Sequence, residues 1–119
     1  MSWLNTANLM LLERFLDVAS MRQTLVTTNL ANVDTPGYHT RDVDFRGELQ
    51  RALDGIDTGT TSPFVLPVRG LVARPDGNNV SVDRESMLLA EVQLQFKSVS
   101  SIIRAQFAQL NTAIKEGQA

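Results

Sequence analysis

The chain of 119 residues contains no cysteine, which excludes a structural disulfide, a thiolate metal site and a cysteine nucleophile. Its only histidine is His39, so a catalytic triad or a histidine-rich metal site would lack the partners that it needs. Aromatic residues make up 6% of the chain, whereas hydrophobic residues make up 43%. This balance favours helices that pack through Leu, Val and Ala, within one domain or one elongated subunit.

The chain also lacks a large excess of either charge, since its formal net charge is -2 at pH 7. Binding to nucleic acid through phosphate contacts needs a basic face, so we expect no nucleic-acid partner. No apolar run reaches the length of about 18 residues that a membrane-spanning helix requires. The first residues lack both the basic start and the uninterrupted apolar stretch of a secretory signal, so we expect no cleaved signal peptide.

Proline and glycine are scarce in the first third of the chain, where apolar residues recur at a spacing of three and four. This period is typical of an amphipathic helix, which we predict from about Asn8 to about Ala31. Residues at this spacing form one line along the expected helix, which we call its seam. The seam consists of Leu9, Leu12, Leu16, Ala19, Gln23, Val26, Leu30 and Val33, of which only Gln23 is polar.

The last third has the same period, and neither proline nor glycine occurs between Arg84 and Glu116. We predict a second long helix there, with Asp83 as its N-cap and Gly117 at its end. Its seam consists of Leu89, Val92, Phe96, Val99, Ile103, Gln106, Leu110 and Ala113.

Two long helices, one at each end of the chain, predict a mainly α fold in which they pack as an antiparallel, coiled-coil-like hairpin. Such a pair buries only one seam per helix, so apolar residues off the seam, such as Phe15, Ile102 and Phe107, would stay exposed. We therefore expect these helices to pack on other chains, or to order fully only when they do. A monomeric helical bundle is the alternative.

The middle of the chain, between Tyr38 and Val82, contains three of the four prolines and most of the glycines. Residues 39–45 alternate and predict a short strand with Asp42 and Asp44 on a solvated face. Residues 47–53 predict a short helix, and 54–63 a loop. Residues 71–74 and 80–82 predict a small β-hairpin around a turn at 75–79. The chain thus divides into a helical arm with its turn (1–37), an outward-facing segment partly disordered in the isolated subunit (38–82) and a second helical arm (83–119).

No combination of residues indicates catalysis or metal binding. Asp42 and Asp44 could do acid–base work only in a pocket that separates their pKa values, and the sequence around them predicts none. Asp76-Gly77-Asn78-Asn79 resembles the start of a calcium loop, but Val80 and Ser81 stand where that loop needs an acid or amide and then a glycine. We expect no catalytic residue, no cofactor and no metal.

The most specific segment follows the first helix. Thr35 precedes a proline and is pushed toward extended conformations, and Pro36-Gly37 fits the central positions of a type II turn. Short polar side chains can satisfy the backbone groups that become free where the helix ends. The segment reads NLANVDTPGY, and its characteristic residues are Asn29, Ala31, Asn32, Thr35, Pro36, Gly37 and Tyr38.

This order of residues resembles the N-terminal signature of the flagellar axial proteins, which build the rod, the hook and the hook-associated segments. The short chain, without a large central insertion, is similar to a rod subunit. Three further segments resemble a proximal rod subunit: RDVDF at 41–45, DGNNVSVDRE at 76–85 and QLNTAIK at 109–115. The resemblance does not extend to residues 50–66, and Phe96 stands where the family pattern has a tyrosine.

The resemblance implies a structural subunit that is exported through the flagellar type III apparatus and polymerises into the periplasmic drive shaft. Its implied partners are copies of itself, other rod proteins, a basal-body adaptor protein, the membrane ring and the export gate. The alternatives are a soluble helical adaptor or chaperone of the export system and a sibling proximal rod protein. Seam residues would hold the hairpin and off-seam residues would contact other chains. The predicted assembly residues are Phe15, Leu16, Val26, Phe96, Val99, Ile102, Ile103, Phe107 and Leu110.

Overall fold

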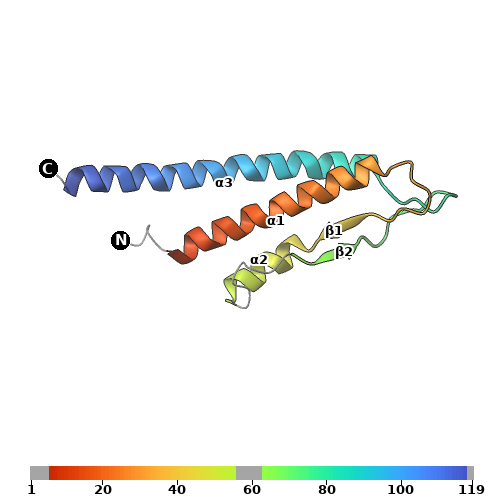
Figure 1. Cartoon of the computed structure of the whole chain (residues 1–119), viewed down its shortest axis with the longest axis horizontal. Coiled ribbons are helices and arrows are strands. Elements are labelled where there is room, and N and C mark those ends of the chain that lie inside the picture. Colours follow the sequence, from red (N-terminus) through yellow and green to blue (C-terminus); the bar gives the residue numbers. More distant parts are fainter. Residues whose placement is uncertain (1–5, 56–62, 118–119) are drawn as a thin grey trace.

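The computed structural model describes residues 6–55 and 63–117. Two long helices run antiparallel along a molecule with extents of 70 × 27 × 18 Å (Figure 1). The mainly α fold, with long terminal helices in contact, is therefore confirmed. In chain order the elements are α1 (Thr6–Ala31), β1 (Arg41–Val43), α2 (Phe45–Leu53), β2 (Val65–Pro67) and α3 (Val82–Gly117).

Helix α1 lies between α3 on one side and the segment from β1 to β2 on the other (Figure 1). Ala19 and Val26, which belong to the predicted seam, are buried. Val18 and Leu25 lie off that seam, yet they are also buried, in a cluster with Val43 of β1. The prediction that each helix would bury a single seam is thus wrong for α1, because the middle of the chain covers its second face.

Helix α3 buries apolar side chains only over its first half, at Leu88, Val92 and Val99. Beyond Val99 the described residues of α3 are half-buried or exposed. The helix has 36 residues against 26 in α1, and its C-terminal end runs past the start of α1 (Figure 1). The second half of α3 therefore has much less intramolecular packing than the first.

The start of α3 lies two residues earlier than predicted. The helix begins at Val82, and the Ser81 hydroxyl accepts the Arg84 N–H at 3.2 Å. Asp83 is therefore not the N-cap but part of the first turn, where its charge still favours the positive end of the helix dipole. Ser81 takes the capping role because it occupies the position just before the first helical residue.

The short helix in the middle is confirmed, and it begins two residues earlier than predicted. Asp44 caps it by accepting the Gly47 N–H at 3.1 Å, so that α2 starts at Phe45. The only buried residue of α2 is Glu48. This helix is therefore held in place by a buried carboxylate together with Phe45, which packs against the cluster of Val18, Leu25 and Val43.

A small antiparallel sheet lies in the middle of the chain, and β1 falls within the strand predicted at 39–45, which is thus confirmed. The hairpin predicted at 71–74 and 80–82 is wrong. β1 pairs with β2, with Arg41 opposite Pro67 and Val43 opposite Val65. Residues 71–74 and 80–82 form no strand. They flank a tight turn in which the Gly77 N–H donates to the Arg74 carbonyl at 2.8 Å. The residues that follow this turn bind the segment that follows α1 in the sequence. Most of the loop predicted at 54–63 lies outside the described residues.

Candidate functional site

The predicted turn after α1 is present. Tyr38 N–H donates to the Thr35 carbonyl at 3.2 Å, and Gly37 has φ of 76°. Pro36 and Gly37 are thus the central residues of a four-residue turn, and the positive φ of Gly37 is the value that a type II turn requires. The turn lies against residues 74–85, and together these two segments with the end of α1 and residues 38–42 form what we call the junction.

Asn29 lies at the centre of the junction and is fully buried. Its amide nitrogen donates to the Arg41 carbonyl at 2.9 Å and to the Glu85 carboxylate at 3.1 Å. Its oxygen accepts the Tyr38 hydroxyl at 2.8 Å and the Arg41 N–H at 3.2 Å. These four bonds use the full capacity of an amide side chain. One residue therefore joins α1, the start of β1 and α3.

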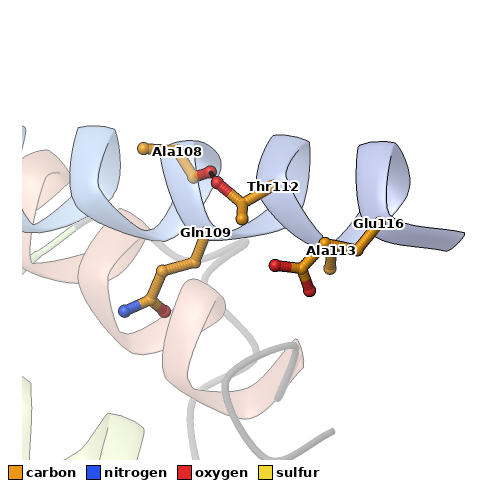
Figure 2. Close-up of a pocket in the computed structure, with 5 residues that line it drawn as sticks. All are labelled: Ala108, Gln109, Thr112, Ala113 and Glu116. Carbon is orange, nitrogen blue, oxygen red and sulfur yellow. Dashed lines mark hydrogen bonds between the residues drawn. The ribbon is translucent and has the colours of Figure 1, made fainter. Parts of the chain in front are cut away.

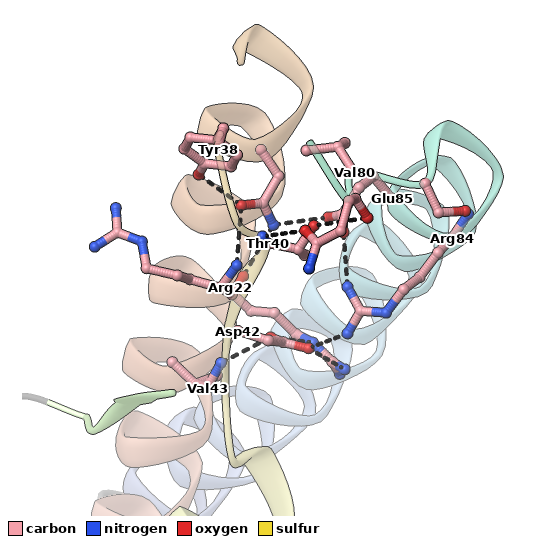
Figure 3. A network of polar contacts seen from close by, with 12 residues as sticks. Arg22, Tyr38, Thr40, Asp42, Val43, Val80, Arg84 and Glu85 are labelled. Carbon is pink, nitrogen blue, oxygen red and sulfur yellow. Dashed lines mark hydrogen bonds and ion pairs between the residues drawn. The ribbon is translucent and has the colours of Figure 1, made fainter. Parts of the chain in front are cut away.

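An ion-pair network extends from this centre (Figure 3). The Asp42 carboxylate accepts two hydrogen bonds of 3.2 Å from Arg22 of α1 and one of 2.8 Å from Arg84 of α3. Arg84 also pairs with Glu85 at 2.6 Å. Two acids and two arginines thus balance one another where water has limited access, which is the condition for tolerating buried charge.

The burial of Asp42 corrects the sequence-based expectation that it lies on a solvated strand face, since only 9% of the residue is exposed. The carboxylate turns inward because two guanidinium groups from different helices converge on it. Asp42 also accepts the Val43 N–H at 2.8 Å. Asp44 does not share this environment, because it is exposed and caps α2.

The two asparagines after Gly77 complete the junction. Asn78 is fully buried and donates to the carbonyls of Asn32 at 2.8 Å and Thr35 at 2.9 Å. Asn79 accepts the Thr40 N–H at 2.7 Å through its side chain, and its own N–H donates to the Tyr38 carbonyl at 3.3 Å. The two polar motifs that the sequence separates by some forty residues are therefore two halves of one hydrogen-bonded unit.

The sequence indicates each of these two motifs separately but does not indicate that they bind each other. Asn78 and Asn79 offer a signal for this contact, because they have no helix to cap and their amides must find other hydrogen-bond partners. An amide placed beside a turn and an apolar run needs several partners if it is buried. The backbone carbonyls of the segment that follows α1 are those partners.

A second ionic cluster attaches α2 to α1. Arg14 and Glu48 are 4% and 1% exposed and pair at 3.0 Å. Glu48 also pairs with Arg51 and accepts the Phe64 N–H at 2.8 Å. This one carboxylate therefore links α1, α2 and the start of β2.

Phe15 supports the same attachment, since its ring meets that of Phe45 edge-on with centroids 5.0 Å apart. The sequence predicts that Phe15 contacts other chains. The ring has a partner within its own chain, and a role for it in assembly stays a prediction.

The remaining predicted assembly residues fall into two groups. Seam residues are buried or half-buried in the hairpin, where a residue that holds the two helices together must lie. Off-seam Ile102 and Phe107 are 47% and 58% exposed. Among the seam residues, the buried ones are Val26 and Val99, and the half-buried ones are Leu16, Phe96, Ile103 and Leu110.

Catalytic chemistry finds no support in this geometry. Over residues 6–55 and 63–117 no three His, Cys, Asp or Glu side chains lie close enough together to bind a metal ion. An open depression near the end of α3 has a single ionisable group, Glu116, so no acid–base pair can form there (Figure 2). None of the described helices is long and apolar enough to cross a membrane.

Comparison with known proteins finds no matching family model. The chain is 32% identical to the flagellar basal body rod protein FlgB of Borrelia hermsii, over 88% of this chain and 93% of that protein. It is 30% identical to FlgB of Bacillus subtilis, over 90% and 92% of the two chains. It is also 30% identical to FlgB of Escherichia coli, over 86% and 88%. The similarity spans both helical arms and the segment between them.

Proposed function

Because the chain belongs to the FlgB family of flagellar basal body rod proteins, we propose that it polymerises through its two helical arms as a subunit of the proximal rod. It is a structural protein and not an enzyme. In the rod it helps to form the tubular drive shaft that transmits torque and encloses the export channel.

The observation that carries this proposal is the unfinished packing of α3. Ile102, Phe107 and Ile114 are 47%, 58% and 49% exposed on a helix that has buried side chains only up to Val99. A large apolar surface on an isolated subunit is typical of a protein that completes its packing on other chains. An elongated hairpin that does so through unlike surfaces builds a helical filament.

The junction has a defined role in such a filament. It fixes the direction in which the chain leaves α1, and it ties that exit to the start of α3 through Asn29 and Asp42. The hairpin then enters the rod with its register already set, while the middle of the chain faces outward.

The partners are copies of the chain, other rod proteins, a basal-body adaptor protein, the membrane ring and the type III export gate. The protein reaches the periplasmic part of the basal body through that gate without a cleaved signal. The exposed ends of the two helices are the surfaces on which such partners would bind.

A deletion strain tests the proposal. Cells that lack the chain should be non-motile and should yield basal bodies without rods in electron microscopy, and a plasmid copy should restore both. In the complemented strain, mass spectrometry of purified basal bodies should detect the chain. Intact rods in the deletion strain would overturn the proposal. A chain recovered only in a small soluble complex would favour the adaptor or chaperone of the export system instead.

A further inference from the structure

Helix α1 has an acidic strip on the face that neither α3 nor the middle of the chain covers. Glu13 and Asp17 are exposed one turn apart, and Leu9 and Met10 beside them are 36% and 52% exposed. Within the described part of the chain neither carboxylate forms an ion pair. Like charges at this spacing destabilise a helix slightly, so the strip brings no benefit to α1 itself.

The bases nearest in sequence cannot neutralise this strip. Arg14 points to Glu48, and Arg22 points to Asp42. Both guanidinium groups are turned toward the middle of the chain and are largely buried there. The acidic strip therefore needs a partner from elsewhere.

Helix α3 has a surface of the opposite charge. Lys97, Arg104 and Lys115 are exposed and lie seven and eleven residues apart, spacings that return to the same flank of a helix. Phe107 and Ile114 lie beside them and are 58% and 49% exposed. Arg104 reaches only the Ser100 carbonyl, at 3.4 Å, and no ion pair involves the three bases within the described residues. We call this surface the basic flank.

We propose that the acidic strip of one copy docks on the basic flank of a second copy of this chain. Glu13 and Asp17 then face Arg104 and Lys115, while Leu9 and Met10 cover Phe107 and Ile114. Glu13 and Asp17 lie about 6 Å apart along α1 and Arg104 and Lys115 about 16 Å apart along α3, so the two long basic side chains reach inward to the acids from either side. This inference rests on the proposed function and names the contact that joins copies within the rod.

The proposed contact joins two different surfaces, the acidic strip of one copy and the basic flank of the next. Each copy that docks through its strip leaves its own basic flank free for the next copy. Such a heterologous contact does not close on a pair, and it continues as an open helical array unless the rotation between copies closes a ring. Charge complementarity of this kind also fixes the register of the contact.

Charge reversal tests the contact in the purified full-length chain. Sedimentation velocity would compare the parent with Glu13→Lys/Asp17→Lys, with Arg104→Glu/Lys115→Glu, and with the chain that carries all four changes. Each double reversal should weaken self-association about tenfold at low salt, as two exposed ion pairs would. The fourfold variant should regain most of the loss, because the charges are opposite again. Glu91→Lys, an exposed acid outside the strip, is the matched control and should change nothing.

Two results would overturn the proposal. Double reversals that associate like the parent show that these surfaces do not meet, and a fourfold variant as weak as either double variant shows that they do not meet each other. Thermal unfolding of each variant should match the parent, which separates lost contact from lost folding. If the reversals abolished motility in cells without any change in self-association, the two surfaces would bind a different rod protein and not a second copy of this chain. Failure of the proposed function itself would instead leave intact rods in the deletion strain.

Discussion

Gly37 and Gly77 pack backbone against backbone where the two turns of the junction meet. A Cβ atom on Gly77 would lie 3.3 Å from the Cα atom of Gly37. Both residues have positive φ, 76° and 87°. The Gly37 N–H donates to the Asp76 carbonyl at 2.9 Å across this contact. The close approach of the two turns therefore requires that Gly77 has no side chain, whereas a Cβ atom on Gly37 would meet open space and that residue needs only its positive φ.

Gly77→Ala should lower the free energy of unfolding by about 2–3 kcal/mol, of which about 1–2 kcal/mol comes from the positive φ alone. The remainder comes from the forced separation of the two turns. Gly70→Ala is the matched control, because Gly70 has φ of 83° and open space around it. Urea denaturation of the purified chain would measure both. Equal losses in the two variants would contradict the close-approach argument.

Asn29→Ala should cost about 3 kcal/mol, because it leaves the Arg41 backbone and the Tyr38 hydroxyl inside the protein without their partner. Tyr38→Phe removes only one of these hydrogen bonds and should cost about 1 kcal/mol. The same denaturation experiment ranks the two. A smaller loss for Asn29→Ala than for Tyr38→Phe would show that the asparagine is not the centre of the junction.

Glu48→Gln should release α2 from α1 without opening the junction. The change leaves Arg14 and Arg51 with a neutral amide in place of a carboxylate, in a site where Glu48 is 1% exposed. Loss of one member of a buried ion pair is strongly destabilising. Hydrogen exchange should therefore rise over residues 45–53 and stay unchanged at Asn29 and Arg84.

Glu13→Gln is the control for this experiment, since it removes an exposed acid from the same helix α1 and should not alter exchange in α2. If exchange rose equally at the junction and in α2, the two ionic clusters would form one cooperative unit rather than two.

The helices and the turn could be predicted from the sequence, because their signals are local. Apolar spacing located α1 and α3 to within two residues at each end, and Pro36-Gly37 identified the turn. Family resemblance on the same segments identified the rod proteins. All of this rests on patterns among residues that are close together in the sequence.

The junction and the packing of the segment from β1 to β2 on α1 could not be predicted, because they depend on contacts between distant polar residues. Nothing near Asp42 indicates that Arg22 and Arg84 converge on it, and so the carboxylate was expected in water. For the same reason the hairpin was expected around Gly77, although β1 takes its partner from Val65–Pro67. Period-two patterns indicate which segments suit a strand, and long-range packing selects which of them pair.

Phe107→Asp should block rod assembly and motility while secretion of the chain and its stability in isolation stay near those of the parent. The ring is 58% exposed on the poorly packed half of α3, so the substitution removes almost no intramolecular contact. In the assembled rod, however, a carboxylate would enter an apolar contact and lose its hydration. Val72→Asp is the control, because Val72 is 90% exposed in the middle of the chain, outside the predicted interface. Swimming assays and electron microscopy of basal bodies would compare the two, and equal motility of Phe107→Asp and the parent would remove this face of α3 from the interface.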